Sequence, residues 1–234
     1  MNKLITGIER TGKQILDRPF LKVFLLGMFT TAGVLLLSFV LANEIIKEIP
    51  LYASGWAWWQ TFVNGMLGWI YTFSLLFIVF IFFVPISTLI ISIFLDDVID
   101  CVEDKYYPHK KAKNRKNFLH LVFLSVRMMF FIIFFNFLVL PIYMLFFWVP
   151  FLSVIVFYLL NGYLLGWGYY EMIAFRHLGI KEAGVHRKSI WFMILLAGMI
   201  MTFLFMLPIV QFVAPIISVA LICHLFHLSE FEEI

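Results

Sequence analysis

Charged residues are scarce in this 234-residue sequence, and their scarcity excludes an ordinary soluble domain. Asp, Glu, Lys and Arg make up 13% of the residues, hydrophobic residues make up 63%, and the mean hydropathy is +1.00. A soluble domain has about a quarter charged and about half apolar residues. The 29 phenylalanines are more than a soluble protein of this size could hide from water. The composition therefore predicts a membrane protein.

Cysteines and catalytic motifs are scarce as well. The two cysteines, Cys101 and Cys223, are both expected on the cytoplasmic side, where they predict no disulfide, and two cysteines alone make no metal motif. The sequence contains no Gly-x-Ser-x-Gly, Walker A, His-Glu-x-x-His or Cys-x-x-Cys pattern. We therefore expect no enzyme activity, no cofactor and no ATP-driven transport by this chain alone.

Long apolar runs predict an all-α integral membrane fold, because the strands of a β-barrel would alternate apolar and polar residues. Four apolar blocks occur within a single membrane domain (1–234): 20–42, 62–95, 118–160 and 190–228. About 20 apolar residues cross a bilayer as a helix. The first two blocks are therefore expected to be the first and second transmembrane helices, the first of them an uncleaved anchor.

The basic residues predict the orientation. Sixteen of the 17 lysines and arginines lie in the N-terminal segment through Lys22, in 96–127 and in 161–189, whereas 43–61 contains only Lys47. Cytoplasmic segments are enriched in Lys and Arg. The three basic segments and both chain termini are therefore expected in the cytoplasm of a bacterium, beneath its inner membrane.

The cytoplasmic segment 96–117 begins as an amphipathic helix. Its apolar positions recur at helical spacing, and Pro108 closes it before a basic loop that is expected to contact lipid headgroups. The acidic positions are expected on the opposite face, which is solvated above the bilayer or, as the alternative, contributes to a pore vestibule: Asp96, Asp97, Asp100, Glu103 and Asp104. No nucleic-acid recognition fold accompanies the basic loop, so membrane lipids, and not nucleic acid, are its expected partners.

Blocks three and four each begin and end on the cytoplasmic side, so each is expected to form a hairpin. Proline breaks a helix but is tolerated in a first turn. We therefore place the hairpin tips at the central prolines, which are Pro141 and Pro150 in the first hairpin and Pro208 and Pro215 in the second.

Both tips are apolar, which favours re-entrant hairpins that stop inside the membrane; two short complete crossings in each block are the alternative. Freed backbone groups inside a membrane need partners from the protein or a cavity. Gln211 is the one side chain between Pro208 and Pro215 able to form hydrogen bonds, so it is expected to satisfy the tip's backbone.

Five segments carry a resemblance to a known family. They read DRPFLKVFLL (17–26), LDDVIDCVEDKYYP (95–108), LSVRMMFF (124–131), GYYEMIAFRH (168–177) and LPIVQFVAPIISVALICHLFH (207–227). In their order and spacing they resemble CysZ-type sulfate permeases, the bacterial branch of the etoposide-induced protein 2.4 family. The resemblance implies two long transmembrane helices, two partly penetrating hairpins, a homo-oligomer and the uptake of sulfate.

The chain departs from this family at the implied anion site. The sequence IFLDD (93–97) stands in place of the Gly-Leu-Leu-Ala-Glu motif, whose backbone amides, together with arginines of the first helix, hold the anion in the family. Lys22 matches the first of those arginines and Val23 replaces the second. The glycine that lets a backbone approach an oxyanion is absent. A non-transporting membrane scaffold that acts on partners or lipids therefore stays open beside a permease.

The candidate residues for anion binding or permeation lie near the block ends. Arg127, nine residues into block three, is the most unusual, because a charge at such a place costs about 2.5–3.5 kcal/mol and usually faces protein or a cavity. It is expected to pair with an acid such as Glu171, Asp97 or Asp100, or to reach lipid headgroups. The complete set is Arg18, Lys22, Asp97, Asp100, Arg127, Glu171, His177 and Gln211.

Some of these side chains have simpler interpretations. Lys22 can extend to the headgroups, and Glu171 and His177 fit an interfacial helix end. His224 and His227 share a helical face near the end of block four, where a helix dipole favours them. They lack a third ligand, so the sequence predicts no metal site.

Overall fold

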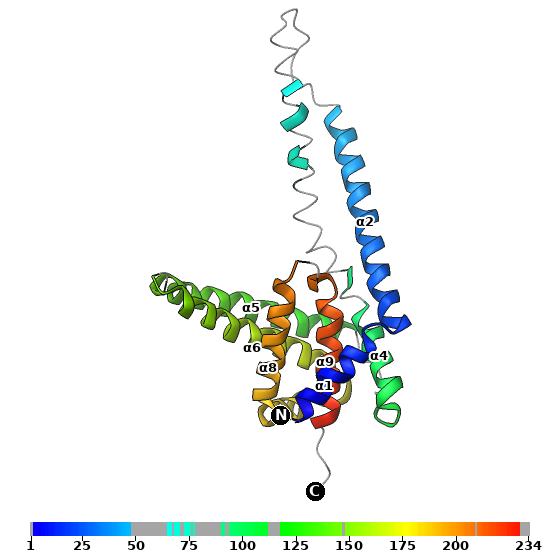
Figure 1. The fold of residues 1–234 in the computed structure, drawn as a ribbon, viewed down its shortest axis with the longest axis vertical. Coiled ribbons are helices and arrows are strands. Elements are labelled where there is room, and N and C mark those ends of the chain that lie inside the picture. Colours follow the sequence, from blue (N-terminus) through cyan, green and yellow to red (C-terminus); the bar gives the residue numbers. More distant parts are fainter. Residues whose placement is uncertain are drawn as a thin grey trace, which may run out of the picture. The chain divides into compact units, whose positions relative to one another are not determined.

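The structure is a computed structural model, and every regular element in the residues that it describes is helical (Figure 1). The described residues are 2–47, 65–66, 68–70, 73–75, 77, 90–91, 94–111, 118–146, 148–208 and 210–229. Two helices, Arg18–Leu41 and Pro150–His177, are long and apolar enough to cross a membrane. The prediction of an all-α integral membrane protein is confirmed.

The described chain divides into two compact units. The smaller unit is Lys22–Ile93, and the larger one joins Met1–Leu21 to Phe94–Ile234. Most of the second expected transmembrane helix, 62–95, lies outside the described residues.

Helix α2 (Arg18–Lys47) supplies most of the described part of the smaller unit. Its buried positions recur every four residues, at Val23, Gly27, Thr31 and Leu35, and large apolar side chains between them are exposed. A Cβ added to Gly27 would overlap the side chain of Ile91, so glycine permits this close approach. A narrow buried stripe on an otherwise exposed apolar helix is typical of a membrane helix with small residues at its contact.

Helix α9 (Ala214–Ser229) lies at the centre of the larger unit, and its side chains are almost all buried. Helix α1 (Asn2–Gln14) packs against it through one face, which contains Leu4, Gly7, Thr11 and Gln14. Helix α4 (Leu95–Tyr106) also packs against α9 and buries the apolar stripe of the expected amphipathic helix. The short helix η1 (Pro108–Lys110) follows α4. These contacts join the two ends of the chain.

The first hairpin consists of α5 (Phe118–Leu145) and α6 (Pro150–His177). Pro150 is the first residue of α6, as expected for a hairpin tip. Pro141 lies inside α5, so the expected helix break at Pro141 is absent. A proline removes one backbone donor, and membrane helices tolerate this loss where neighbouring groups compensate. The turn therefore begins only after Leu145.

Helix α6 does not end with the third apolar block at residue 160. It continues through the expected cytoplasmic segment as far as His177. The glycines of this stretch serve helix packing. A Cβ added to Gly166 would overlap the backbone of Ile194, and a Cβ at Gly198 would overlap the carbonyl of Gly162. Small residues let α6 cross close to α8 (Trp191–Met206). In Figure 1 the first hairpin accordingly runs across α8 and α9.

The second hairpin has two short arms, α8 and α9, of 16 residues each. A 16-residue helix is about 24 Å long, whereas the hydrocarbon core is about 30 Å thick. Helix α7 (Ile180–Ser189) precedes α8 and meets it at an angle of 83°. The short arms favour a re-entrant hairpin. The bend between α7 and α8 fits a chain that lies along the membrane surface in α7 and enters the membrane in α8.

The tip of the second hairpin contains the short helix η2 (Val210–Phe212). Helix α8 ends at Met206, shortly before Pro208, and Pro215 is the second residue of α9. Gln211 Nε2 donates a hydrogen bond to the Pro208 carbonyl at 2.8 Å. The side chain expected to satisfy the tip's backbone does so.

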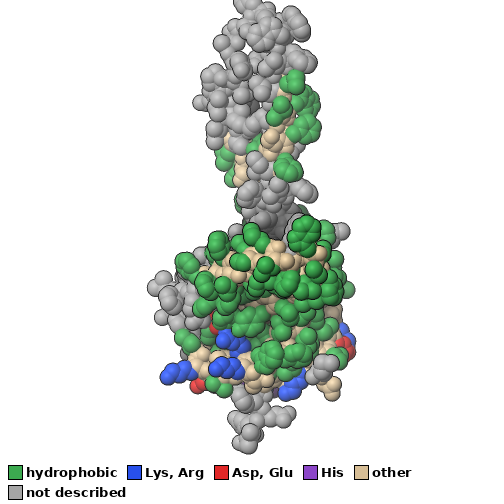
Figure 2. Space-filling view, turned by 90° about the vertical axis from the view of Figure 1, so that its left-hand side faces the viewer, with side chains coloured by type: hydrophobic (Ala, Val, Ile, Leu, Met, Phe, Trp, Pro, Cys, Tyr) green, Lys and Arg blue, Asp and Glu red, His purple; other side chains and the backbone are tan. Residues whose placement is uncertain are grey.

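The face of the larger unit drawn in Figure 2 separates apolar from charged side chains. Hydrophobic side chains cover its middle, and Lys, Arg, Asp and Glu side chains gather at the end where α1 and α7 lie in Figure 1. This distribution is typical of a protein whose charged end meets water at the membrane surface.

Candidate functional site

Glu103 of α4 is completely buried, although the sequence analysis placed it on a solvated face. Its side chain is 0% exposed. Residues four apart share a helical face, and Glu103 follows the buried Ile99 by four residues. The buried face of α4 is thus wider than its apolar stripe, which corrects the expectation for this one acid.

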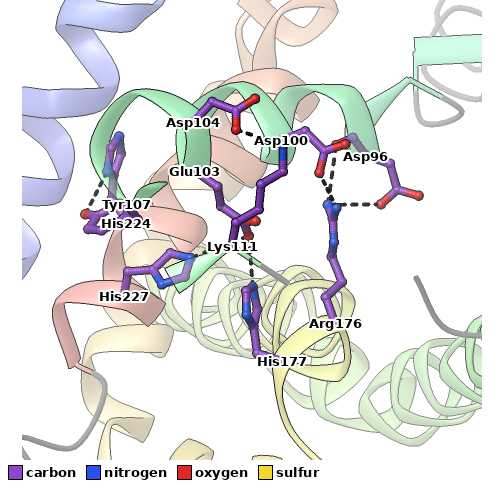
Figure 3. Close-up of polar contacts among 10 residues, drawn as sticks. All are labelled: Asp96, Asp100, Glu103, Asp104, Tyr107, Lys111, Arg176, His177, His224 and His227. Atoms are coloured by element: carbon purple, nitrogen blue, oxygen red, sulfur yellow. Dashed lines mark hydrogen bonds and ion pairs between the residues drawn. The ribbon is translucent and has the colours of Figure 1, made fainter. Parts of the chain in front are cut away.

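Two histidines from different helices face the Glu103 carboxylate (Figure 3). His177 Nε2 of α6 lies 2.9 Å from Oε1, and His227 Nε2 of α9 lies 3.5 Å from the same oxygen. Burial by itself raises the pKa of Glu103, but the contacts with His177 and His227 and the nearby Arg176 outweigh burial and lower the pKa to about 2. Glu103 is therefore a buried carboxylate that is ionised at neutral pH.

Arg176 connects α6 to the acidic side of α4, next to this carboxylate. Its Nη2 pairs with Asp100, and its Nη1 lies 3.5 Å from Asp96 Oδ1 and 3.3 Å from the Asp96 carbonyl (Figure 3). The Arg176 side chain is 9% exposed. A guanidinium with several oxygen partners in a mostly buried place fixes the end of α6 against α4.

Tyr107 lies at the end of α4 and connects α4 to α1 and α9. Arg10 Nη1 donates to the Tyr107 hydroxyl at 3.0 Å, and this hydroxyl lies 3.0 Å from His224 Nδ1. His224 Nε2 lies 2.9 Å from Gln14 Oε1, which accepts, so this nitrogen carries the proton and Nδ1 accepts from Tyr107. Burial, opposed by the hydrogen bond from Arg10, raises the pKa of Tyr107. His224 thus belongs to a satisfied buried network.

A separate pocket of about 210 Å³ lies between α5, α6 and α7. The Arg187 guanidinium lies over the Trp167 ring, 4.3 Å from its centroid. Glu171 Oε1 accepts from Trp167 Nε1 at 2.7 Å and from Arg187 Nη1 at 3.3 Å. The Arg187 side chain is 24% exposed, so one partly accessible cation faces an aromatic pocket. Such an arrangement can bind a small anion if the anion displaces the Glu171 carboxylate from Arg187.

The structure places the eight candidate residues in different surroundings. Asp100 and His177 meet the buried cluster of α4 and α6, and Glu171 lines the pocket. Arg18, Lys22 and Asp97 are exposed, and Gln211 bonds to the hairpin tip. The Arg127 side chain lies outside the described residues.

Three residues of these clusters were not among the predicted site residues: Glu103, Arg176 and Arg187. The two arginines counted only as cytoplasmic charge. Two of the three acids considered as partners for Arg127 pair with them, Asp100 with Arg176 and Glu171 with Arg187. One signal was available for Glu103, its spacing of four residues from Ile99. Nothing in the sequence identified the partners of the arginines, because these pairs join different helices.

Comparison with known proteins identifies the family. The model of the family described as sulfate transporter CysZ/etoposide-induced protein 2.4 (EI24) matches residues 8–215. The chain belongs to the EI24 family. The resemblance seen in the sequence is thereby confirmed, and with it a membrane protein of transporter type. No curated protein and no solved structure matches the chain.

This EI24 member differs from the family pattern at the start of α4, where the implied anion motif would lie. Leu95 is buried, Asp96 faces Arg176, and Asp97 is exposed. Phe94 at the N-cap provides no side-chain hydrogen bond. The N-terminus of a helix attracts anions, but two carboxylates in the first turn of α4 repel them.

Proposed function

We propose that this chain is a permease for a small oxyanion, with sulfate as its leading substrate, in the inner membrane of a bacterium with both termini in the cytoplasm. The observation that carries the proposal is the family match over residues 8–215. The sequence contains no ATP-binding motif. Transport is therefore passive or coupled to protons.

Arg187 is the proposed contact for the anion. A tetrahedral dianion fits a pocket of about 210 Å³ and prefers a guanidinium, whose planar set of donors suits oxyanions. When the anion replaces Glu171 beside Arg187, the Trp167 indole N–H can donate to the anion in place of the carboxylate. The exchange of one anion for another keeps the arginine neutralised, which permits binding and release.

The start of α4 is a poorer anion site in this chain. Asp96 and Asp97 bring two negative charges where the family pattern has backbone amides and a glycine. Arg176, the cation nearest to Asp96, is held by Asp96 and Asp100 together. Among the described residues, Arg176 pairs with two carboxylates and Arg187 with one, so an incoming dianion would displace fewer partners at Arg187.

Sulfate flux in liposomes tests the proposal. We expect purified protein in liposomes to take up radiolabelled sulfate faster than empty liposomes, and other tetrahedral oxyanions to compete. The variant Arg187→Gln should lose at least about tenfold in flux, since one charge-assisted contact is worth about 1.5–3 kcal/mol. Lys181→Gln is the matched control, because Lys181 is an exposed cation on the same helix.

Two results would overturn parts of the proposal. Flux no greater than in empty liposomes, at every imposed pH gradient, would overturn sulfate permeation by this chain. An equal reduction of flux in Arg187→Gln and Lys181→Gln would be consistent with permeation but would show that Arg187 is not the contact for the anion.

A non-transporting membrane scaffold is the second candidate. The observation that favours it is the pair Asp96 and Asp97 at the position of the family's anion motif. A scaffold should co-purify with other membrane proteins or with a defined lipid after mild detergent extraction. Recovery of self-oligomers alone would count against it and would support the homo-oligomer that we propose for the permease.

A further inference from the structure

The fold brings two further possible metal ligands, Glu103 and Cys223, close to His227. Cys223 and His227 are four residues apart on α9, so they share one helical face. Glu103 approaches that face from α4, 120 or more positions away in the chain. One ligand atom from each of Glu103, Cys223 and His227 lies within 4.8 Å of the other two, and all three residues are buried.

The chemistry of the three donors suits a divalent transition metal. A thiolate sulfur, an imidazole nitrogen and a carboxylate oxygen are the ligands that proteins use for Zn²⁺, whereas Mg²⁺ and Ca²⁺ prefer oxygen alone. Bonds of about 2.0–2.3 Å in a tetrahedral site place ligand atoms about 3.3–3.8 Å apart. Side-chain rotations that move the ligand atoms by about 1 Å would bring their separations into this range.

A second observation points to a ligand at this place. Glu103 Oε2 is buried and forms no hydrogen bond in the described part of the chain, while Oε1 faces His177 and His227. An uncompensated carboxylate oxygen in a buried site is costly. Coordination of a cation by Oε2 would remove this cost without disturbing the hydrogen bond between Oε1 and His177.

The charges and the surrounding residues also fit. One Glu carboxylate and one Cys thiolate neutralise a divalent cation, and an electrically neutral site is the least costly one in a buried environment. The Tyr107 ring stacks on the His227 imidazole with centroids 4.4 Å apart, which fixes the plane of this ligand. His177 orients the Glu103 carboxylate, as a hydrogen-bonded residue behind a metal ligand commonly does.

We propose that Glu103, Cys223 and His227 form a Zn²⁺ site that ties α4 to α9 at the charged end of the larger unit. The site leaves a fourth position for water. The effect of the site is structural. One metal–ligand bond from α4 and two from α9 hold α4 on the second hairpin. This inference does not depend on which solute the protein transports.

Cobalt spectroscopy of the full-length protein, purified without a polyhistidine tag, tests the site. After removal of metal with a chelator, we expect about one Co²⁺ per chain to bind and to give a near-ultraviolet thiolate-to-cobalt charge-transfer band. Stoichiometric Zn²⁺ should abolish the band. Cys223→Ser should lose it, and Cys101→Ser is the matched control that should keep it.

Protection of the thiol in the unaltered protein gives a second readout, in case Cys223→Ser fails to fold. Zn²⁺ should slow the alkylation of Cys223 at least tenfold, with Cys101 of the same molecule as internal reference. His227→Gln should remove this protection. The proposal is overturned if no charge-transfer band forms, if only millimolar Zn²⁺ protects Cys223, or if Cys101→Ser loses the band as well.

Discussion

Arg176 of α6 pairs with Asp100 of α4, 76 positions earlier in the chain. The arginine side chain is 9% exposed and the aspartate side chain 22% exposed, so water screens this ion pair only in part. This pair and its neighbour, Glu103 with His177, both join α4 to α6 and so help to hold α4 on the first hairpin.

Loss of the Arg176 guanidinium should destabilise the protein. Removing one partner of a mostly buried pair leaves the other without compensation, so Arg176→Gln should lower the free energy of unfolding by about 2 kcal/mol. Thermal unfolding in detergent measures the change. The double variant Arg176→Gln/Asp100→Asn should cost less than the sum of the single changes, since each removes the same pair.

The control for Arg176 is Lys111→Gln. Lys111 pairs with Asp104 at 2.7 Å, but their side chains are 42% and 62% exposed. Exposed pairs contribute about 0–1 kcal/mol, so this change should have little effect. Equal destabilisation by Arg176→Gln and Lys111→Gln would contradict the role given to Arg176.

The contact between α6 and α8 should not tolerate a methyl group at Gly198. A Cβ there would overlap the Gly162 carbonyl and lie 2.9 Å from the Gly166 backbone nitrogen. Backbone atoms of a packed helix cannot rotate away, so we expect Gly198→Ala to cost about 3 kcal/mol or more, the upper end of ordinary overpacking. Thermal unfolding in detergent measures this change as well.

Gly12→Ala is the matched control for Gly198→Ala. Gly12 lies on α1, and a Cβ there would have nothing within 4 Å. Alanine favours a helix over glycine by about 1 kcal/mol, so Gly12→Ala should leave the stability unchanged or increase it. If both variants unfold at the wild-type temperature, the close crossing of α6 over α8 is wrong.

The tip of the second hairpin should not reach the far side of the membrane. With arms of 16 residues, a cysteine introduced as Phe212→Cys should resist a membrane-impermeant maleimide added outside intact cells. Ser54→Cys, in the segment expected outside, should react. Labelling at both positions, identified by mass spectrometry of the peptides, would show that the hairpin crosses completely.

The fold could be predicted to a large extent because its determinants are local. The apolar blocks, the surface helix α4 and the proline at the start of α6 each follow from residues that are close in the sequence. Pro141 was misleading for the same reason. The close contact of Gly162 and Gly166 with α8 could not be predicted, because only the tertiary structure shows it.

The polar clusters could be predicted only in part, because their members come from distant helices. Glu103 and His177 are 74 positions apart, and no local pattern pairs them. His224 and His227 share a face of α9 in the sequence, but the structure gives their ring nitrogens different polar partners. His224 meets Gln14 and the Tyr107 hydroxyl, and His227 meets Glu103. Long-range pairing of this kind is fixed by helix packing.

Release of Arg187 from its carboxylate partner should strengthen anion binding. Glu171→Gln removes the negative charge that competes with a permeating oxyanion, and the amide oxygen can still accept from Trp167 Nε1. We expect the KM for sulfate flux in liposomes to fall about fivefold, equivalent to about 1 kcal/mol at one partly exposed ion pair. Asp104→Asn is the control, because it removes an exposed charge on α4 that does not line this pocket. A KM that rises in Glu171→Gln would show that the carboxylate helps the anion through the pocket by another route, such as carrying a coupled proton.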